Sequence, residues 1–217
     1  MGQICNSGGC FVGKAESILS LGGRLAIDFA NVPCLPGQPI RKSLSWEELL
    51  EFLEASRIIS AERRAQLLSL PQSDGQSADA LLGRATRLRD RLRQIFGALV
   101  RKERLESEWV EAINGVLRIT EGHDELVYEV GQWKLEFIAR EGGLDWLLAA
   151  IARSGAEILA EGKATRLRAC GNSSCSFFFY DKSRTHKRRW CSMSLCGNRH
   201  KVAAFAKRQS TRNRVGA

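Results

Sequence analysis

Four cysteines near the C-terminal end constrain this chain of 217 residues more than any other feature. They form two pairs with the same C-x4-C spacing, and fifteen residues separate the pairs. The cysteines are Cys170, Cys175, Cys191 and Cys196. Four thiolates supply the tetrahedral ligand set that zinc prefers, and four protein ligands leave no open position for a catalytic water. The spacing therefore predicts one structural Zn²⁺.

The start of the chain bears on the redox state of these cysteines. It lacks the basic and long apolar segments of a secretion signal, and no apolar run in the sequence is long enough to cross a membrane. We therefore expect a cytoplasmic protein, in which paired cysteines bind metal before they form disulfides. Disulfides and an iron–sulfur cluster are the alternatives. The remaining cysteines have no such pairing and are expected to be free thiols: Cys5, Cys10 and Cys34.

The residues around the two pairs predict a small zinc finger. Each pair would form a knuckle, and the span between them would hold a β-hairpin with the aromatic run 177–180 on one arm and residues 181–183 near its turn. A helix is expected over 198–208, directly after the last ligand. A knuckle, a hairpin and a helix in this order make a treble-clef finger.

The aromatic run has two faces if it is a strand. Alternation puts Phe177 and Phe179 on one face and Phe178 and Tyr180 on the other. One face is expected in the core, and base stacking by the other is the less favoured alternative. The helix after the last cysteine is expected to pack an apolar stripe on this run and turn a basic face outward. That stripe consists of Val202, Phe205 and Ala206.

Positive charge is concentrated at the C-terminal end of the chain. The net charge is +9, from 33 Lys and Arg against 24 Asp and Glu. Residues 161–217 hold 14 of the bases and two of the acids, giving +12, whereas residues 1–160 sum to −3. A basic segment that also carries a metal site indicates a polyanionic partner, most often a nucleic acid. A tail that only improves solubility is the alternative.

Contacts to phosphate would come from the hairpin and the helix of the finger. The predicted nucleic-acid-binding residues are Lys187, Arg188, Arg189, Arg199, His200, Lys201, Lys207 and Arg208. Basic groups on two neighbouring elements can follow a phosphate backbone. For Arg199 a structural role is an equal alternative, in which its guanidinium donates to carbonyl groups of the finger.

The first 160 residues are expected to form a mostly helical body. Capping residues and apolar spacing predict the helices, and two segments that flank Gly131 and Gln132 predict a β-hairpin. The helices are expected over 45–56, 60–70 with Pro71 closing it, 79–103, from Ser107 onward, and 144–159; the strands are expected over 24–32, 125–130 and 133–139. The fold class is thus α+β, mostly α, with an α-rich domain over 20–160, a few short strands, and the finger over 165–210.

The body also offers a candidate pocket for a small molecule. The basic side chains of the long helix are expected to form a solvated face that pairs with Asp90 and Glu103. The alternative is that some of them form one wall of a ligand pocket. The pocket would be lined by Asp28, Asn31, Arg84, Arg87 and Arg91. The sequence has no phosphate-binding glycine motif, no nucleophile–base pair and no open metal site, so we expect a protein that is not an enzyme.

Two parts of the sequence resemble a known family. Residues 196–199 read Cys-Gly-Asn-Arg and follow Trp-Cys-Ser-Met at 190–193, which is similar to the signature of CGNR zinc fingers. Residues 25–31 are similar to the opening strand of the family's N-terminal ABATE domain. Residues 88–96 and 112–114 are similar to its helical motifs. The resemblance covers about residues 20–208.

The resemblance implies a bacterial, stress-induced transcription regulator with a ligand-binding N-terminal domain and a DNA-binding finger. It also implies the zinc-ligand role for the four cysteines. Val32 stands where many members have Thr after the Asn, so a polar contact from that position is not carried over.

The residues and the resemblance together predict a regulator that binds DNA through its finger. Its body would sense a small molecule or hold a homodimer. Binding to RNA or the ribosome is the first alternative. A protein-interaction module whose finger docks an acidic partner is the second.

Overall fold

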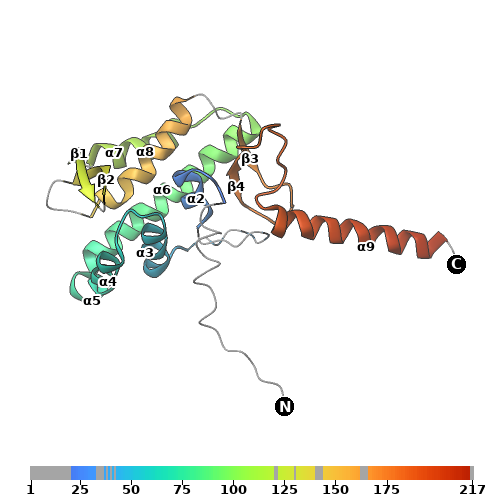
Figure 1. Cartoon of the computed structure of the whole chain (residues 1–217), viewed down its shortest axis with the longest axis horizontal. Helices are drawn as coiled ribbons and strands as arrows, with labels where there is room; N and C mark the ends of the chain where they lie inside the picture. Colours follow the sequence, from blue (N-terminus) through green and yellow to red (C-terminus); the bar gives the residue numbers. More distant parts are fainter. Residues whose placement is uncertain are drawn as a thin grey trace, which may run out of the picture.

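The structure, a computed structural model, has a helical body, a small C-terminal unit and a long last helix (Figure 1). It describes residues 21–32, 37, 39, 41, 43–119, 122–129, 131–139, 144–161 and 166–215. The elements of the body are α2 (Leu25–Asn31), α3 (Trp46–Ala55), α4 (Ala61–Leu68), α5 (Leu70–Ser73), α6 (Gly75–Arg101), α7 (Ser107–Ile119), β1 (Gly122–Glu129), β2 (Gln132–Ala139) and α8 (Trp146–Ala160). The C-terminal elements are β3 (Leu167–Ala169), β4 (Phe178–Tyr180), η2 (Met193–Gly197) and α9 (Asn198–Val215).

Element α2 corrects one prediction. The strand expected over 24–32 is wrong, because Leu25–Asn31 forms a helix. Its buried apolar residues follow a helical stripe rather than an alternating one: Ala26, Ile27, Phe29 and Ala30. A short apolar run is compatible with either element, and here packing against α6 and α8 selects the helix.

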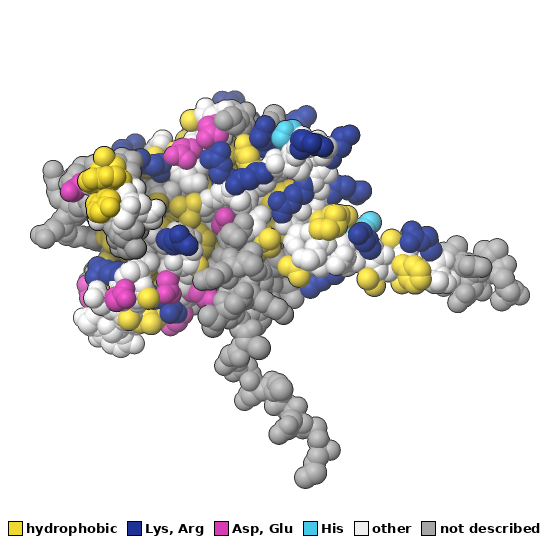
Figure 2. Space-filling view, in the orientation of Figure 1, with side chains coloured by type: hydrophobic (Ala, Val, Ile, Leu, Met, Phe, Trp, Pro, Cys, Tyr) yellow, Lys and Arg dark blue, Asp and Glu magenta, His cyan; other side chains and the backbone are white. Residues whose placement is uncertain are grey.

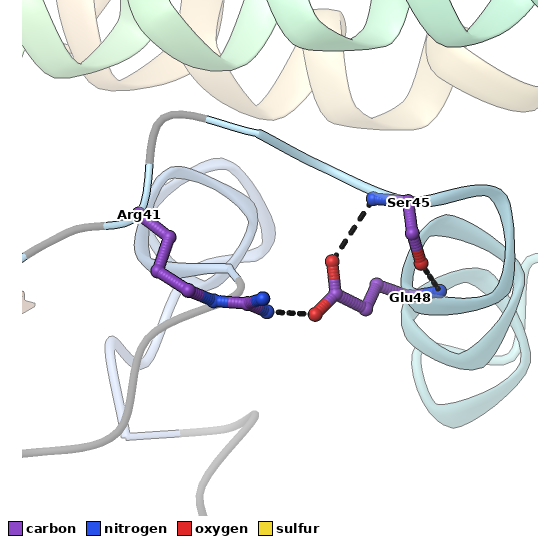
Figure 3. Close-up of polar contacts among 3 residues, drawn as sticks. All are labelled: Arg41, Ser45 and Glu48. Atoms are coloured by element: carbon purple, nitrogen blue, oxygen red, sulfur yellow. Dashed lines mark hydrogen bonds and ion pairs between the residues drawn. The ribbon is translucent and has the colours of Figure 1, made fainter.

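Side-chain caps begin the next helices, as expected. Ser45 accepts a hydrogen bond from the Glu48 amide, and the Glu48 carboxylate accepts one from the Ser45 amide and pairs with Arg41 (Figure 3). This capping box satisfies two backbone donors of the first turn of α3. Ser60 caps α4. Pro71 does not close that helix but lies in the first turn of α5, where its missing amide hydrogen costs nothing.

The long helix α6 forms the axis of the body. Asp74 caps its first turn, and Lys102 ends it in the left-handed conformation. Its apolar stripe packs against α2, α7 and α8, which confirms the predicted amphipathic helix. Gly155 of α8 allows a close helix crossing, since a Cβ there would lie 2.8 Å from a methyl carbon of Leu92.

The predicted hairpin of the body is confirmed. Strands β1 and β2 pair in antiparallel register, with Tyr128 opposite Trp133, and Gly131 has a positive φ in the turn. In the described part of the chain, no helix is apolar and long enough to span a bilayer.

The small C-terminal sheet differs from the predicted finger hairpin. Strand β4 pairs with β3, which precedes Cys170, so the first cysteine pair lies between the paired strands. A hairpin within 176–190 was expected, but the described residues 181–190 contain no strand. Hydrogen bonds that the Asp181 carboxylate accepts from backbone amides close this segment instead of a backbone ladder.

Strand β4 joins two cores. Phe178 and Tyr180 belong to the core of the body, whereas Phe177 and Phe179 pack around the cysteines. The predicted alternation is therefore confirmed. All four rings are buried, so the alternative that one face stacks on bases is wrong. Both sides of β4 are already covered, which leaves no room for the stripe of α9.

The apolar stripe of α9 is consequently exposed. Val202 and Phe205 are 69% and 56% exposed, and Ala206 is exposed too, so the prediction that they pack on the aromatic run is wrong. Among the described elements, α9 makes its main contact with η2 alone, and Figure 1 shows it projecting away from the rest of the molecule.

Candidate zinc centre and nucleic-acid surface

The four predicted ligands converge on one point. The Sγ atoms of Cys170, Cys175, Cys191 and Cys196 all lie within 4.8 Å of one another. The Cys175–Cys191 and Cys191–Cys196 sulfur distances are 3.8 and 3.7 Å. Zinc–sulfur bonds of about 2.3 Å in a tetrahedron require sulfur atoms about 3.8 Å apart. The cluster is thus a four-thiolate site for one zinc ion, and the ion would contribute to folding rather than to a reaction.

The surroundings of the sulfurs favour a bound cation. Hydrogen bonds from the Cys175 and Cys191 thiols lower the pKa of Cys170 to about 2, whereas burial raises the pKa of Cys196 to about 11. Four clustered thiols, three of them buried, therefore cannot all ionise without a compensating positive charge. Two donors already point at the sulfurs. The Asn172 side chain donates to Cys196 Sγ over 3.6 Å, and the Cys191 amide donates to Cys170 Sγ over 3.5 Å.

Asp181 organises the segment between the knuckles. Its carboxylate is fully buried and accepts hydrogen bonds from the amide and hydroxyl of Ser183 and from the Arg188 amide. Burial opposes the charged form, but these bonds hold the pKa of Asp181 below its ordinary value. His186 takes a positive φ of 51° in the same segment. The basic loop, residues 182–189, is therefore held in one conformation although it lacks a strand.

The predicted phosphate contacts in the basic loop divide into two kinds. Arg188 faces inward: its guanidinium lies 4.5 Å from the Phe179 ring centre and donates to the carbonyls of Trp190 and Cys191. Lys187 and Arg189 are exposed. Arg188 thus holds the finger together, and its neighbours face solvent.

Trp190 connects the basic loop to α9. Its ring lies 4.6 Å from the His200 ring and 5.3 Å from the Arg189 guanidinium. Gly171 leaves space for it, since a Cβ there would lie 3.2 Å from the indole. The exposed side chains of Arg189 in the basic loop and His200 in α9 therefore both lie against the buried ring of Trp190.

The remaining predicted contacts lie on α9. Lys201 and Arg208 are exposed, and the side chain of Lys207 lies outside the described residues. Arg199 reaches the body: a Cβ at Gly37 would lie 1.7 Å from its Nη1 atom. This placement puts the Arg199 guanidinium beside Gly37 and favours a structural role for it.

Positive side chains gather around this site. Figure 2 shows Lys and Arg over the part that carries β3, β4 and the start of α9, whereas most visible Asp and Glu lie over the helical body. The exposed cations of the described finger residues are Arg166, Lys182, Arg184, Lys187, Arg189, Arg199, Lys201 and Arg208.

The finger is fixed to the body by polar contacts, buried at Asn31 and partly buried at Arg93, that sequence reasoning missed. Asn31 exchanges two hydrogen bonds with the backbone of Phe178, and Arg93 donates to the carbonyls of Ala30 and Ser176 over 2.8 and 2.9 Å. The Arg93 guanidinium also lies 5.1 Å from the Phe178 ring centre. The sequence did not single out Arg93, because α6 carries several other arginines and only the structure shows that Arg93 is on the side that faces the finger.

Four of the five residues of the predicted pocket have a polar partner of their own. Asn31 binds the finger, Arg84 pairs with Asp145, and Arg91 pairs with Glu108. Asp28 accepts a hydrogen bond from the Gly22 amide, and Arg87 is exposed. The pocket therefore stays a prediction. The predicted ion pairs of α6 are present: Arg89 with Asp90 and Arg101 with Glu103. The three cysteines expected to be free thiols lie outside the described residues.

These features define a class of protein in which a helical domain is built onto a four-cysteine zinc finger. Two family models match the chain, and together they cover most of it. Residues 23–162 match the ABATE family, described as "Putative stress-induced transcription regulator", and residues 166–209 match the CGNR zinc finger. The chain belongs to the ABATE family, with the CGNR finger following that domain. No curated protein matches the chain at a significant level.

Proposed function

We propose that this protein is a transcription regulator that binds duplex DNA through its zinc finger and the start of α9. The observation that carries the proposal is the exposed basic surface built on the metal site. The basic loop and α9 present cations from two elements, and residues 182–217 contain no Asp or Glu. Such a surface can neutralise phosphates along a backbone, which supplies most of the affinity for DNA.

The rigidity of that surface supports the proposal. Asp181 fixes the basic loop, Trp190 aligns Arg189 with His200, and the zinc ligands flank both. Phosphate contacts position a protein on DNA only if their spacing is fixed. The family of the N-terminal domain, described as a transcription regulator, supports the same reading.

The body would serve regulation and not catalysis. We propose that it is not an enzyme and that the protein acts in the cytoplasm. A small-molecule ligand or a homodimer interface would act on the finger through the contacts of Asn31 and Arg93, since these join α2 and α6 to β4 and the residue Ser176 before it. Ligand binding that altered α2 would then alter the placement of the finger.

Fluorescence anisotropy of the zinc-loaded chain on mixed-sequence duplex DNA and on structured RNA tests the proposal. Affinity is measured from about 50 to about 300 mM salt, where each neutralised phosphate adds about 0.9 to the log–log slope. Lys187→Ala with Arg189→Ala is expected to lower the slope by about two units. The matched control, Arg63→Ala with Arg104→Ala, removes the same charge from exposed sites of the body and should leave the slope unchanged.

The outcomes separate the proposed function from its alternatives. Tighter binding to RNA than to duplex DNA would favour an RNA-binding protein. Absence of binding to both polymers at low salt would contradict the proposal and favour a finger that docks an acidic protein. A salt slope that the Lys187 and Arg189 changes leave intact would place the contact elsewhere on the molecule.

A further inference from the structure

Helix α9 presents a face whose chemistry the phosphate contacts do not use. Residues at successive intervals of four, three and four fall on one side of a helix that turns by about 100° per residue. On α9 these residues are Asn198, Val202, Phe205 and Gln209, and all four are exposed. Val202 and Phe205 are 69% and 56% exposed, although burial of such side chains is the usual outcome.

Cations border this face. Lys201 and Arg208 are exposed and lie along one edge, about 100° and 120° from Val202 on the wheel. Arg199 lies on the other side, and no acid occurs anywhere in residues 182–217. The helix is therefore a strip of amide and apolar side chains between positive charges.

The charge selects the kind of partner that covers the face. A second copy of α9 would bring like charges together, which disfavours pairing of two such helices. An anionic lipid surface would match the charge, but it favours an uninterrupted apolar face, whereas here amides stand at both ends of the strip. A polyanion with both hydrogen-bonding and apolar groups between its phosphates matches the whole strip.

The major groove of DNA has this composition. It is about 12 Å wide and admits an α-helix, and α9 rises about 27 Å over its 18 residues. Asn and Gln side chains bind the N6 and N7 edge of adenine in a bidentate manner, and apolar side chains contact the C5 methyl group of thymine. Because α9 projects from the body, no other described element blocks its approach to a groove (Figure 1).

We infer that α9 enters the major groove and selects A·T base pairs, with Val202 and Phe205 against thymine methyls and Asn198 and Gln209 on adenine edges. This inference rests on the proposed DNA-binding function. It assigns the recognition of sequence to the outward strip of α9, while Lys187 and Arg189 of the basic loop and Lys201 and Arg208 of α9 bind phosphates.

Thymine methyls provide a direct test with the full zinc-loaded chain. Anisotropy compares an A·T-rich duplex, a G·C-rich duplex of equal length, and the A·T-rich duplex with deoxyuridine in place of every thymine. We expect the G·C-rich duplex to bind at least about fivefold more weakly, since one bidentate contact discriminates by at least about 1 kcal/mol. Removing the methyls should cost about fourfold for each methyl that Val202 or Phe205 buries.

Variants of the strip assign the effect to its residues. Val202→Ser with Phe205→Ser should bind the thymine and deoxyuridine duplexes equally, with an unchanged salt slope. Gln209→Ala should reduce the preference for A·T over G·C. Ala203→Ser, on another exposed side of the same helix, is the control and should behave as the wild type. Circular dichroism and zinc content show that each variant is folded, which the exposure of these residues leads us to expect.

Failure of this inference is distinguishable from failure of the proposed function. Equal affinity for the three duplexes, with a steep salt slope, would overturn A·T selection and leave DNA binding intact. Absence of binding to every duplex would overturn both. Binding to anionic vesicles that depends on Val202 and Phe205, with methyl-insensitive DNA binding, would assign the strip to a lipid surface and also overturn the inference.

Discussion

Asn31 and Phe178 are joined by two hydrogen bonds of 2.9 Å, although 147 positions separate them in the chain. The Asn31 amide nitrogen donates to the Phe178 carbonyl, and its oxygen accepts from the Phe178 amide. One side chain of α2 thus satisfies both backbone groups of a strand residue, as a neighbouring strand would. The bond pair is buried and couples α2 of the body to the zinc finger.

Replacement of Asn31 should weaken this junction. Asn31→Ala leaves the Phe178 amide and carbonyl buried without partners, and each such group costs about 1–3 kcal/mol. We expect the free energy of unfolding to fall by about 2–6 kcal/mol in urea titrations followed by circular dichroism. Asn114→Ala, on the exposed side of α7, is the control. A loss no larger than that of the control would show that water replaces the Asn31 contacts.

Zinc removal should destabilise the body as well as the finger. Phe178, Tyr180 and Leu167 belong to the core of the body, and their placement depends on the adjacent knuckles. We expect the wild type to contain one zinc ion per chain. Chelation, or Cys191→Ser, should abolish the bound zinc and lower the melting temperature of the whole protein. If the body kept its melting temperature after zinc loss, the two cores would be independent.

Neighbouring arginines should respond differently to the same substitution. Arg188→Ala removes the ring contact with Phe179 and the donors to two carbonyls, so we expect weaker zinc binding in competition with a chelator. Arg189→Ala removes an exposed cation and should leave zinc affinity unchanged while lowering the salt slope for DNA by about one unit. The reverse pattern would mean that Arg188 contacts phosphate.

Local patterns in the sequence were sufficient for the zinc site and for most helices. The cysteine spacing defines its own ligand set, and the Ser45 cap is encoded within four residues. Contacts between distant residues were not predictable in this way. The α2 segment is too short for its apolar pattern to exclude a strand, and packing on α6 decides. The role of Asp181 was not predicted either, although a single acid within a long basic segment is a pattern that indicates such a role.

The exposed stripe of α9 also depends on contacts between distant residues that sequence periodicity does not show. Periodicity places Val202 and Phe205 together, but it does not reveal that both faces of β4 are already covered. The body covers Phe178 and Tyr180, and the knuckles cover Phe177 and Phe179. Only the three-dimensional arrangement shows that the apolar stripe of α9 has no place in the core.

Asp28 should make the stability of the body–finger junction depend on pH. Burial raises the pKa of Asp28 to about 7, although hydrogen bonds from Gly22 and Gly23 and the charge of Lys182 act in the opposite direction. The pKa in the unfolded chain is about 3.9. Between these values the folded state binds more protons than the unfolded state, so stability falls as pH rises from about 4 to 7.

A neutral analogue isolates this contribution. Asp28→Asn keeps an oxygen that accepts from the Gly22 amide and removes the ionisation. From pH 5 to pH 8 the wild type should lose on the order of 2–3 kcal/mol relative to Asp28→Asn, measured by urea unfolding at each pH. Glu157→Gln, at an exposed position of α8, should follow the wild type. Parallel pH profiles for the wild type and Asp28→Asn would show that Asp28 stays ionised in the folded protein, with Lys182 and the glycine amides outweighing its burial.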